Sequence, residues 1–521
     1  MTIQQKKRVA VIGAGASGLA AIKECLDERD NIEVVAFEQE SFIGGLWRYV
    51  EISDENPNPH SSVYKSTIIN TSKEIMTFSD FPIPDDWPTY LPNQMVARYF
   101  EMYAERFGLK EHIRFQTKVI EIRELKDTGS RWMIRFQKTH TPKLAQEEPA
   151  QEEVFDYVMV CTGHHWDPRY PSFPGMDVKN DPEAFTGEQL HSHFYRQADQ
   201  YRDKIVVVVG FGNSAVDLAV ELSMNYSTVY LSSRRPSWVL PRWFMGKPLD
   251  HGRTRFSYNI PPRIVQYITT QRLQRILPPV HKNMRPSQKL FEAYPTVNSI
   301  LPERISTGTI HPMKNIRRLG PGKRVEFEDG SVIENVDSII YCTGFNVRYP
   351  ALTPEVLTDG RPGAEERNQA WVWNYMVPPR HPNLAFVGLV QPLGAIMPIS
   401  EIQSRFLIRI LVGKAASLPS AQQMDLEIQE TRDRIQRQYY DSPRHTIQVE
   451  STPYCDQLAV RIGCYPGWAA LVSKYGFWEG TRLWKGSMFG PSTPLQYRLV
   501  GPNSSSTALD AVRGHSKPKQ D

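Results

Sequence analysis

The sequence predicts an α/β protein in which one unit built on a parallel sheet is interrupted by a second, smaller unit of the same kind. Two apolar runs, beginning at Arg8 and Ile205, are each followed by a glycine-rich loop and a helix-forming stretch, and buried parallel strands have such continuous apolar sequences. The length of 521 residues also exceeds what one core usually organises. We expect residues 1–180 and 336–521 to form the outer unit with the C-terminal region, and residues 195–335 to form the inner unit.

The expected elements follow the chain in this order. "RVAVIG", a helix from Ser17 to about Asp27, and "IEVVAFE" begin the outer unit, and "RWMIRFQK" and "VFDYVMVCTG" are later strands of it. In the inner unit "IVVVVG", "AVDLAVELS" and "STVYLSSRR" predict strand, helix and strand. "VDSIIYCTGF" predicts a further strand at 336–345, and helical stretches are expected near 400–413 and 422–438.

Composition excludes several classes of protein. The 61 Lys and Arg against 57 Asp and Glu give a net charge of +4, with no basic block of the kind that binds nucleic acid. The five cysteines include no Cys-x-x-Cys pair, which argues against a disulfide framework, a zinc site and a dithiol redox centre. His191 and His193 have no evident third ligand, so no metal is expected.

The first glycine loop predicts a dinucleotide site. Gly13, Gly15 and Gly18 form G-x-G-x-x-G between a strand and a helix, which permits a tight turn, close approach of a pyrophosphate and close helix packing. Glu38 ends the next strand, about 20 residues after Gly18, where a carboxylate can bind an adenosine ribose. The stretch "GGLWR" follows, and its two glycines and tryptophan suit a loop that packs on a flat cofactor. The predicted contacts in this region are Gly13, Gly15, Ser17, Gly18, Glu38, Gly45, Leu46 and Trp47.

The second glycine loop predicts another dinucleotide site with a different preference. Here the pattern is G-x-G-x-x-A, and Arg234 and Arg235 stand where the first unit has Glu38. Guanidinium groups bind a 2′-phosphate that a carboxylate would repel, so this site is expected to prefer NADP(H), unless both arginines are only surface charges. The predicted contacts are Gly210, Gly212, Asn213, Ser214, Ala215, Arg234 and Arg235. Two dinucleotides whose reactive rings meet indicate hydride transfer, from NADPH to a resident FAD.

The stretch "FTGEQLHSHFYR" carries a family resemblance. Phe185, Gly187, His191 and Tyr195 match F-x-G-x-x-x-H-x-x-x-[YF], the fingerprint of flavin-containing monooxygenases. "NTSKEIMTFSDFPIP", "CTGHH", "YCTGF", "GLVQPLGAIMPISEIQSRF" and "FGPSTPLQYRLVGP" resemble further parts of that family. The resemblance covers about residues 8–502 and adds Asn70, Thr162, Gly163, Thr343, Gly344 and Gln391 to the predicted site.

The resemblance implies a reaction. NADPH reduces FAD, the reduced flavin takes up O2 as a C4a-hydroperoxide under cover of NADP⁺, and a soft nitrogen or sulfur atom of an amine or sulfide takes the distal oxygen. Such a site must exclude water and proton donors. Asn70 suits it, because a neutral amide can hydrogen-bond the peroxide without delivering a proton; the alternative is an asparagine that only caps backbone.

Two other functions remain open from the sequence. Baeyer–Villiger oxygenases carry a similar fingerprint ending in Trp followed by Pro or Asp, whereas Tyr195 is followed by Arg196. A non-catalytic FAD- and NADP-binding sensor is the other. The second loop ends in Ala215 where animal members of the family usually have glycine, and the apolar tail that anchors them to a membrane is missing, so we expect no membrane span and a cytoplasmic location. A homodimer is compatible with these observations.

Overall fold

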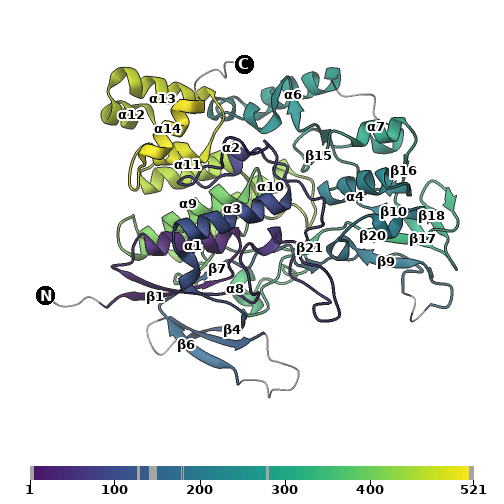
Figure 1. Ribbon diagram of the computed structural model, residues 1–521, viewed down its shortest axis with the longest axis horizontal. Coiled ribbons are helices and arrows are strands. Elements are labelled where there is room, and N and C mark those ends of the chain that lie inside the picture. Colours follow the sequence, from purple (N-terminus) through teal and green to yellow (C-terminus); the bar gives the residue numbers. More distant parts are fainter. Residues whose placement is uncertain are drawn as a thin grey trace.

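The computed structural model describes residues 5–125, 130–139, 149–177, 179, 181–276 and 281–515, and contains two five-stranded sheets with parallel pairing (Figure 1). The first sheet has the order β22-β7-β1-β2-β3. Ile12 pairs with both Phe37 and Val160, so the three central strands end level and their loops meet at one edge. The strands are β1 Lys7–Ile12, β2 Ile32–Phe37, β3 Ile113–Arg114, β7 Tyr157–Val160 and β22 Leu384–Phe386.

The second sheet repeats this arrangement with the order β16-β11-β10-β20-β9. Val209 pairs with Ser232 and Tyr341, so the second set of loops also meets at one edge. The strands are β9 Glu188–His191, β10 Ile205–Val209, β11 Thr228–Ser232, β16 Ile310–Met313 and β20 Ser338–Tyr341. Because β22 joins the first sheet after the whole second sheet has been completed, the outer unit is interrupted by the inner one, which confirms the predicted fold class.

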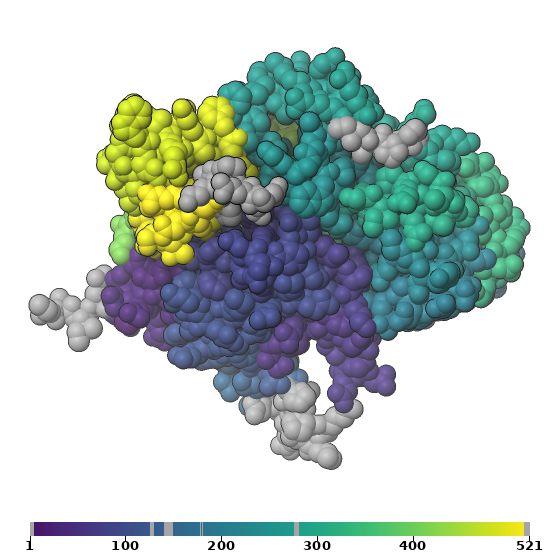
Figure 2. Space-filling model, turned by 45° about the horizontal axis from the view of Figure 1, so that its top comes forward, coloured from purple at the N-terminus to yellow at the C-terminus, as the bar shows by residue number. Residues whose placement is uncertain are grey.

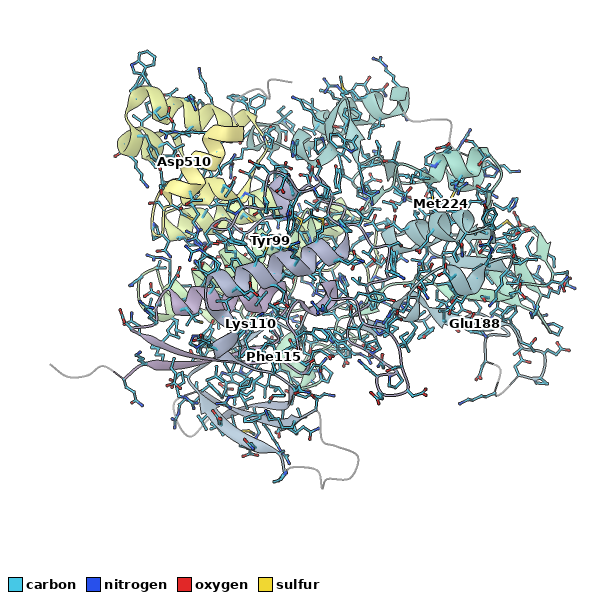
Figure 3. All side chains as sticks on the ribbon, viewed as in Figure 1. Tyr99, Lys110, Phe115, Glu188, Met224 and Asp510 are labelled. Carbon is cyan, nitrogen blue, oxygen red and sulfur yellow. The ribbon has the colours of Figure 1, made fainter. Side chains whose placement is uncertain are left out.

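Helices and antiparallel sheets cover the two parallel sheets. In the outer unit, α1 (Ala16–Leu26) packs on α9 (Ile396–Leu411), and the sheet of β4 (Thr117–Leu125), β5 (Arg131–Lys138) and β6 (Gln151–Phe155) covers the other side (Figure 1). In the inner unit, α4 (Asn213–Met224) packs on β10 and β11, while β17 (Ile316–Leu319) and β18 (Val325–Phe327) pack on the opposite face. Tyr99, buried on α3 (Asn93–Arg106), and Met224, exposed at the end of α4, mark the two units in Figure 3.

The remaining elements connect and extend these units. The strands are β4 Thr117–Leu125, β5 Arg131–Lys138, β6 Gln151–Phe155, β8 Asp167–Pro168, β12 Val239–Leu240, β13 Trp243–Phe244, β14 Lys247–Pro248, β15 Thr296–Val297, β17 Ile316–Leu319, β18 Val325–Phe327, β19 Val332–Ile333, β21 Phe345–Asn346, β23 Gln391–Leu393 and β24 Gln448–Glu450. The helices are α2 Lys73–Met76, α3 Asn93–Arg106, α5 Arg255–Tyr258, α6 Pro262–Ile276, α7 Leu301–Ser306, α8 Pro354–Thr358, α10 Ala421–Gln438, α11 Ser451–Ile462, α12 Trp468–Tyr475, α13 Phe477–Phe489 and α14 Ser506–His515. Within the described residues, no helix has both the length and the apolar character needed to cross a membrane.

The structure corrects two expectations about strands. "VFDYVMVCTG" is not one strand: it divides at Asp156, whose Oδ2 accepts the Arg8 N–H, and β6 and β7 enter different sheets. The strand expected at 336–345 belongs to the second sheet rather than to the outer unit, and β9 also lies outside the range 195–335. The physical reason is that central strands of a parallel sheet need a hydrogen-bonded neighbour on both sides.

Candidate functional site

In the first glycine loop, Gly13 and Gly18 stand where the backbone segments pack too closely to admit a side chain. A Cβ on Gly18 would lie 1.9 Å from the Gly13 carbonyl oxygen, and Gly13 itself has φ of 99° with Cys161 O at 2.9 Å from its ideal Cβ. Gly15 begins α1 as its N-cap, and no acidic residue stands in the first turn. The amino terminus of α1 therefore presents free N–H groups and a positive dipole, which fits a pyrophosphate.

Glu38 lies beside this loop, at the end of β2. Its carboxylate accepts N–H groups from Ala14 at 2.7 Å and Glu40 at 2.9 Å. Burial raises the pKa of Glu38 to about 7, against the effect of these two backbone hydrogen bonds. Each oxygen keeps a second lone pair, so the group can still accept a ribose hydroxyl.

The segment Gly45–Trp47 forms a short 3-10 turn that lies against the first loop. The Gly44 N–H donates to Ala14 O at 3.0 Å, and an ideal Cβ on Gly45 would lie 3.1 Å from the Gly15 Cα. Leu46 is held through its carbonyl, which accepts from the Ser61 hydroxyl. The Ser17 hydroxyl lies 2.8 Å from that of Ser400 on α9, while its backbone N–H, in the first turn of α1, remains available to a cofactor.

The second glycine loop has the same design. A Cβ on Gly210 would lie 2.5 Å from Cys342 O, while Gly212, the N-cap of α4, has nothing within 4 Å of its ideal Cβ. The first turn of α4 again contains no acidic residue, and Ala215 is completely buried beneath it. Ser214 is exposed, and Asn213 accepts the Val297 N–H at 2.8 Å.

Arginines gather beside this second loop without carboxylate partners. Arg234 and Arg235 follow β11 and are exposed, and Arg235 lies 5.0 Å from the ring centroid of Tyr440. The surrounding protein, together with the charges of Arg234 and Arg169, lowers the pKa of Arg444. Across the described parts of the chain, no ion pair involves Arg169, Arg234 or Arg444. Uncompensated like charges of this kind suit an anion such as the 2′-phosphate of NADPH.

A cavity of about 1480 Å³ lies between the units. Asn70 from the outer unit, Asn213 at the start of α4, and Pro392 next to Gln391 all line it. The segment 240–297 of the inner unit forms much of the wall, and Figure 2 shows an opening among the atoms of this teal region. The cavity thus brings together three regions that the sequence singled out, while Gln391 itself accepts from Gln448 at 3.0 Å and does not line it.

Asn70 has one strong side-chain contact. Its Oδ1 accepts a hydrogen bond from Nη2 of Arg242 at 2.8 Å. Two residues further on, Ser72 donates its N–H and its hydroxyl to Oδ2 of Asp250 at 2.7 and 2.9 Å. The segment that carries Asn70 is therefore attached to residues 242–250 of the inner unit.

The fingerprint residues lie at the junction of the two units and not in the cavity. Phe185 is fully buried, and a Cβ on Gly187 would lie 2.4 Å from its ring. Nδ1 of His191 accepts the His193 N–H at 3.1 Å, and burial lowers the pKa of His191 to about 4, so the ring is neutral at pH 7. Tyr195 stacks on Tyr201 with ring centroids 5.7 Å apart. Tyr195 also packs against Tyr64 of the outer unit, with ring centroids 5.7 Å apart, so the fingerprint contributes to the packing between the units.

The two strand-end turns occupy equivalent places at the sheet edges. Thr162 and Gly163 follow β7, and the Thr162 carbonyl lies 3.1 Å from Nε2 of His60. Thr343 and Gly344 follow β20, and the Thr343 hydroxyl donates to the Arg169 carbonyl. Each turn therefore lies beside the glycine loop of its own sheet.

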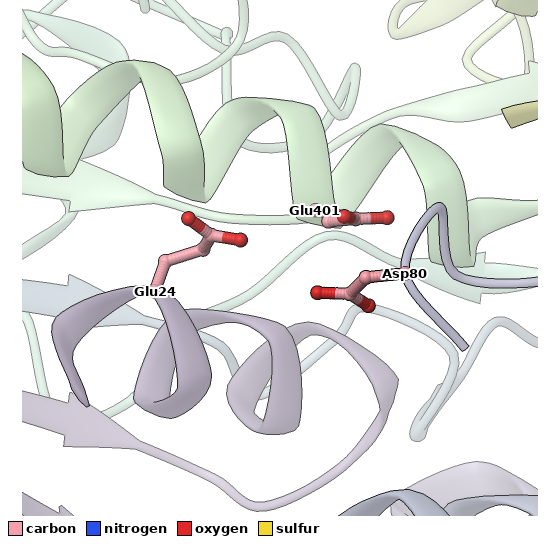
Figure 4. A group of neighbouring side chains, drawn as sticks. All are labelled: Glu24, Asp80 and Glu401. Carbon is pink, nitrogen blue, oxygen red and sulfur yellow. The ribbon is translucent and has the colours of Figure 1, made fainter. Parts of the chain in front are cut away.

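One group of carboxylates has oxygens close enough to hold a cation. Glu24, Asp80 and Glu401 converge with oxygens within 4.8 Å of one another (Figure 4). Arg498 lies among them, with Nη2 at 3.1, 3.1 and 2.6 Å from Glu24, Asp80 and Glu401, and Lys23 lies 2.6 Å from Asp80. These two side-chain cations already occupy the positions between the carboxylates, so we assign no metal to the group.

Comparison with known proteins decides the family. The family model described as flavin-binding monooxygenase-like matches residues 6–517. The chain belongs to this family. It is accordingly a flavoprotein monooxygenase that contains FAD and uses NADPH and O2, acting on a small molecule.

Individual relatives agree over nearly the whole chain. Flavin-containing monooxygenase 5 of Cavia porcellus is 38% identical over 525 residues, covering 97% of this chain and 91% of that protein. Among solved structures, S-allyl-L-cysteine S-oxygenase from Allium sativum has a TM-score of 0.65 at 23% identity and covers 98% of both chains. Cyclohexanone monooxygenase from Rhodococcus sp. Phi1, bound to NADP⁺, has a TM-score of 0.61 at 16% identity and covers 91% of this chain and 99% of that one. These two structures show that the monooxygenase shares their fold.

The structure also reveals site residues that no sequence motif identified. Arg242 beside Asn70, and Arg169 and Arg444 beside Arg234, come from separate segments that meet only in the folded chain. The described parts of the segment 240–297 combine short strands with α6, and no motif in them marks the residues that line the cavity.

Proposed function

We propose that this monooxygenase oxygenates soft nitrogen or sulfur atoms of small amines and sulfides, and that Asn70 is its catalytic residue. The observation that carries the proposal is the position of Asn70 in a cavity that also reaches Asn213 of the NADPH-side helix and Pro392. A relative supports the substrate class: the protein of Pan troglodytes named dimethylaniline monooxygenase [N-oxide-forming] 2 is 36% identical over 518 residues.

The residues of the chain fit the two cofactors. The loop at Gly13–Gly18 and Glu38 would hold FAD, and the loop at Gly210–Ala215 with Arg234 would hold NADPH. When bound, FAD supplies oxygen activation and NADPH supplies the hydride. Asn70 contributes a neutral amide, which can bind an oxygen atom or the nicotinamide amide without releasing a proton.

The lining of the cavity restricts proton donors near Asn70. Neither histidine nor cysteine occurs among the described residues that line it. Burial raises the pKa of Asp250, which also lines the cavity, above its usual value, although the two hydrogen bonds that it accepts from Ser72 lower that pKa. Burial also raises the pKa of the Tyr294 hydroxyl well above its usual value. A lining whose described residues include neither histidine nor cysteine favours a site in which the activated oxygen reacts with a nucleophile before it is protonated.

Product analysis tests the reaction. The purified enzyme is supplied with NADPH, ¹⁸O₂ and, in separate reactions, a thioether, a tertiary amine and a cyclic ketone. We expect S-oxide and N-oxide carrying one labelled oxygen per NADPH consumed. A lactone as the main product would instead support the Baeyer–Villiger alternative, against which the sequence Tyr195-Arg196 argues; Arg196 is buried and donates to the carbonyls of Val50 and Ser61.

Arg234 provides a test of the NADPH site. Arg234→Ala is expected to lower kcat/KM for NADPH by about 10–100-fold, because a charge-assisted hydrogen bond to phosphate contributes about 1.5–3 kcal/mol. With NADH, which lacks the 2′-phosphate, we expect less than about a twofold change. Arg317→Ala, at an exposed arginine of β17, is the control. Equal losses with both nucleotides would contradict the phosphate role.

A further inference from the structure

The hydrogen bond between Arg242 and Asn70 joins the two units at the proposed reaction site. Arg242 lies between β12 and β13 of the inner unit, whereas Asn70 lies just before α2 of the outer unit. Both residues line the cavity, and both are half-buried. The donor is Nη2 of Arg242 and the acceptor is Oδ1 of Asn70, at 2.8 Å.

This contact determines which end of the Asn70 amide faces the cavity. A guanidinium has only donors, so it can be satisfied by the carboxamide oxygen and never by the NH2 group. With the oxygen accepting from Arg242, the NH2 group points away from the guanidinium and offers two N–H donors to a ligand. The amide orientation, which is otherwise ambiguous for asparagine, is therefore set by its neighbour.

Arg242 is itself held in place. Its N–H donates to the Ser299 hydroxyl at 3.1 Å, and its carbonyl accepts from the Leu249 N–H at 2.8 Å and from the Tyr90 hydroxyl. Its guanidinium carbon lies 5.9 Å from the ring centroid of Tyr90. No carboxylate forms an ion pair with Arg242 within the described chain. The guanidinium instead donates its side-chain hydrogen bond to Asn70.

We infer that Arg242 is a positioning residue: it fixes Asn70 with its amide N–H groups toward the cavity, and so makes the retention of activated oxygen depend on the docking of the inner unit. The inference rests on the proposed function of Asn70. It explains why the Asn70 segment is attached to the inner unit a second time, through Ser72 and Asp250. With the segment 242–250 in place, the Asn70 oxygen faces Arg242 and the NH2 group is turned away from it, where it can donate to a ligand.

A double-mutant cycle tests this coupling. Arg242→Met is expected to raise the H2O2 released per NADPH by about tenfold, since a hydrogen bond to a charged group contributes about 1.5–3 kcal/mol and 1.4 kcal/mol is a factor of ten. The rate of anaerobic flavin reduction and the KM for NADPH should change by less than about twofold. In an Asn70→Ala background, Arg242→Met should add almost nothing, because the residue through which it acts has gone.

Asn70→Asp tests the hydrogen bond from Arg242 separately from the N–H donors of Asn70. An aspartate keeps an oxygen for Arg242 but has no N–H group to offer the cavity. We expect its melting temperature to equal or exceed that of the wild type, while its H2O2 yield rises to that of Asn70→Ala. Arg242→Met should instead lower the melting temperature in the wild-type background and not in the Asn70→Ala background. Arg275→Met changes an exposed residue of α6 that does not line the cavity, and it should change neither quantity.

The outcomes distinguish failure of the inference from failure of the proposed function. If Asn70→Ala leaves coupling unchanged, the role of Asn70 is wrong and the inference falls with it. If Asn70→Ala uncouples the enzyme but Arg242→Met does not, or if the two effects multiply in the double variant, the inference alone is overturned. A raised KM for NADPH with unchanged coupling also overturns it. Arg242→Leu, which likewise has no donor for the Asn70 oxygen, replaces Arg242→Met if that variant does not fold, with the same expected rise.

Discussion

Gly15→Val is expected to yield folded protein without FAD. Gly15 has φ of −78° and ψ of −167°, which valine can adopt, and its ideal Cβ is 3.6 Å from Gly45 Cα, an ordinary contact. The backbone therefore tolerates the change. The branches of the valine, however, would occupy the approach to the amino terminus of α1, where the pyrophosphate must come within contact of the backbone.

The measurement is the absorbance of the purified protein near 450 nm, relative to protein concentration. We expect at least about a tenfold loss of bound FAD, with a circular dichroism spectrum close to that of the wild type. Gly514→Val, in α14 and with nothing within 4 Å of its ideal Cβ, should keep its flavin. Stoichiometric FAD in Gly15→Val would show that the first loop is not the flavin site.

Arg498→Met is expected to cause the largest loss of stability. Arg498 is 1% exposed and forms ion pairs with Glu24, Asp80 and Glu401, which come from α1, the segment after α2, and α9. Burial alone would lower the pKa of Arg498, but these carboxylates raise it well above its usual value. Removing the guanidinium leaves buried carboxylates facing one another, which costs about 3–5 kcal/mol.

Urea denaturation of the FAD-loaded protein measures this loss. Arg513→Met, which removes an ion pair with Glu479 that is 42% exposed on the arginine side, should cost only about 0–1 kcal/mol. Arg498→Lys should give an intermediate value, because one ammonium cannot contact all three carboxylates. A loss in Arg498→Met as small as that in Arg513→Met would mean that the network does not hold the C-terminal region to the flavin unit.

Local patterns predicted the three central strands of each parallel sheet, but not the outer strands β3, β22, β9 and β16. The helix expected from Ser17 to about Asp27 is α1, Ala16–Leu26, and "RWMIRFQK" is β5. The glycine loops could be located because their function requires glycine at fixed spacing between a strand and a helix. The strand at 338–341 was assigned to the wrong unit, because an apolar run predicts a buried strand but does not indicate which sheet that strand joins.

The parts that could not be predicted depend on contacts between distant segments. Arg242 and Asn70 are 172 positions apart, and the Arg498 network joins residues up to 474 positions apart. A single arginine on an irregular segment carries no pattern, and a buried charge looks in sequence like any surface charge. For Ser17, whose cofactor contact stays a prediction, the sequence did not indicate that its hydroxyl lies 2.8 Å from that of Ser400 on α9.

The central claim is that the two nucleotide sites meet at a cavity in which Asn70 retains activated oxygen for the substrate. The most direct measurement is H2O2 released per NADPH oxidised by Asn70→Ala, alongside its rate of anaerobic flavin reduction. We expect the reduction rate to stay within about twofold of the wild-type rate, while most of the NADPH oxidised yields H2O2 instead of oxygenated product. Wild-type coupling in Asn70→Ala, or a matching collapse of the reduction rate, would contradict it.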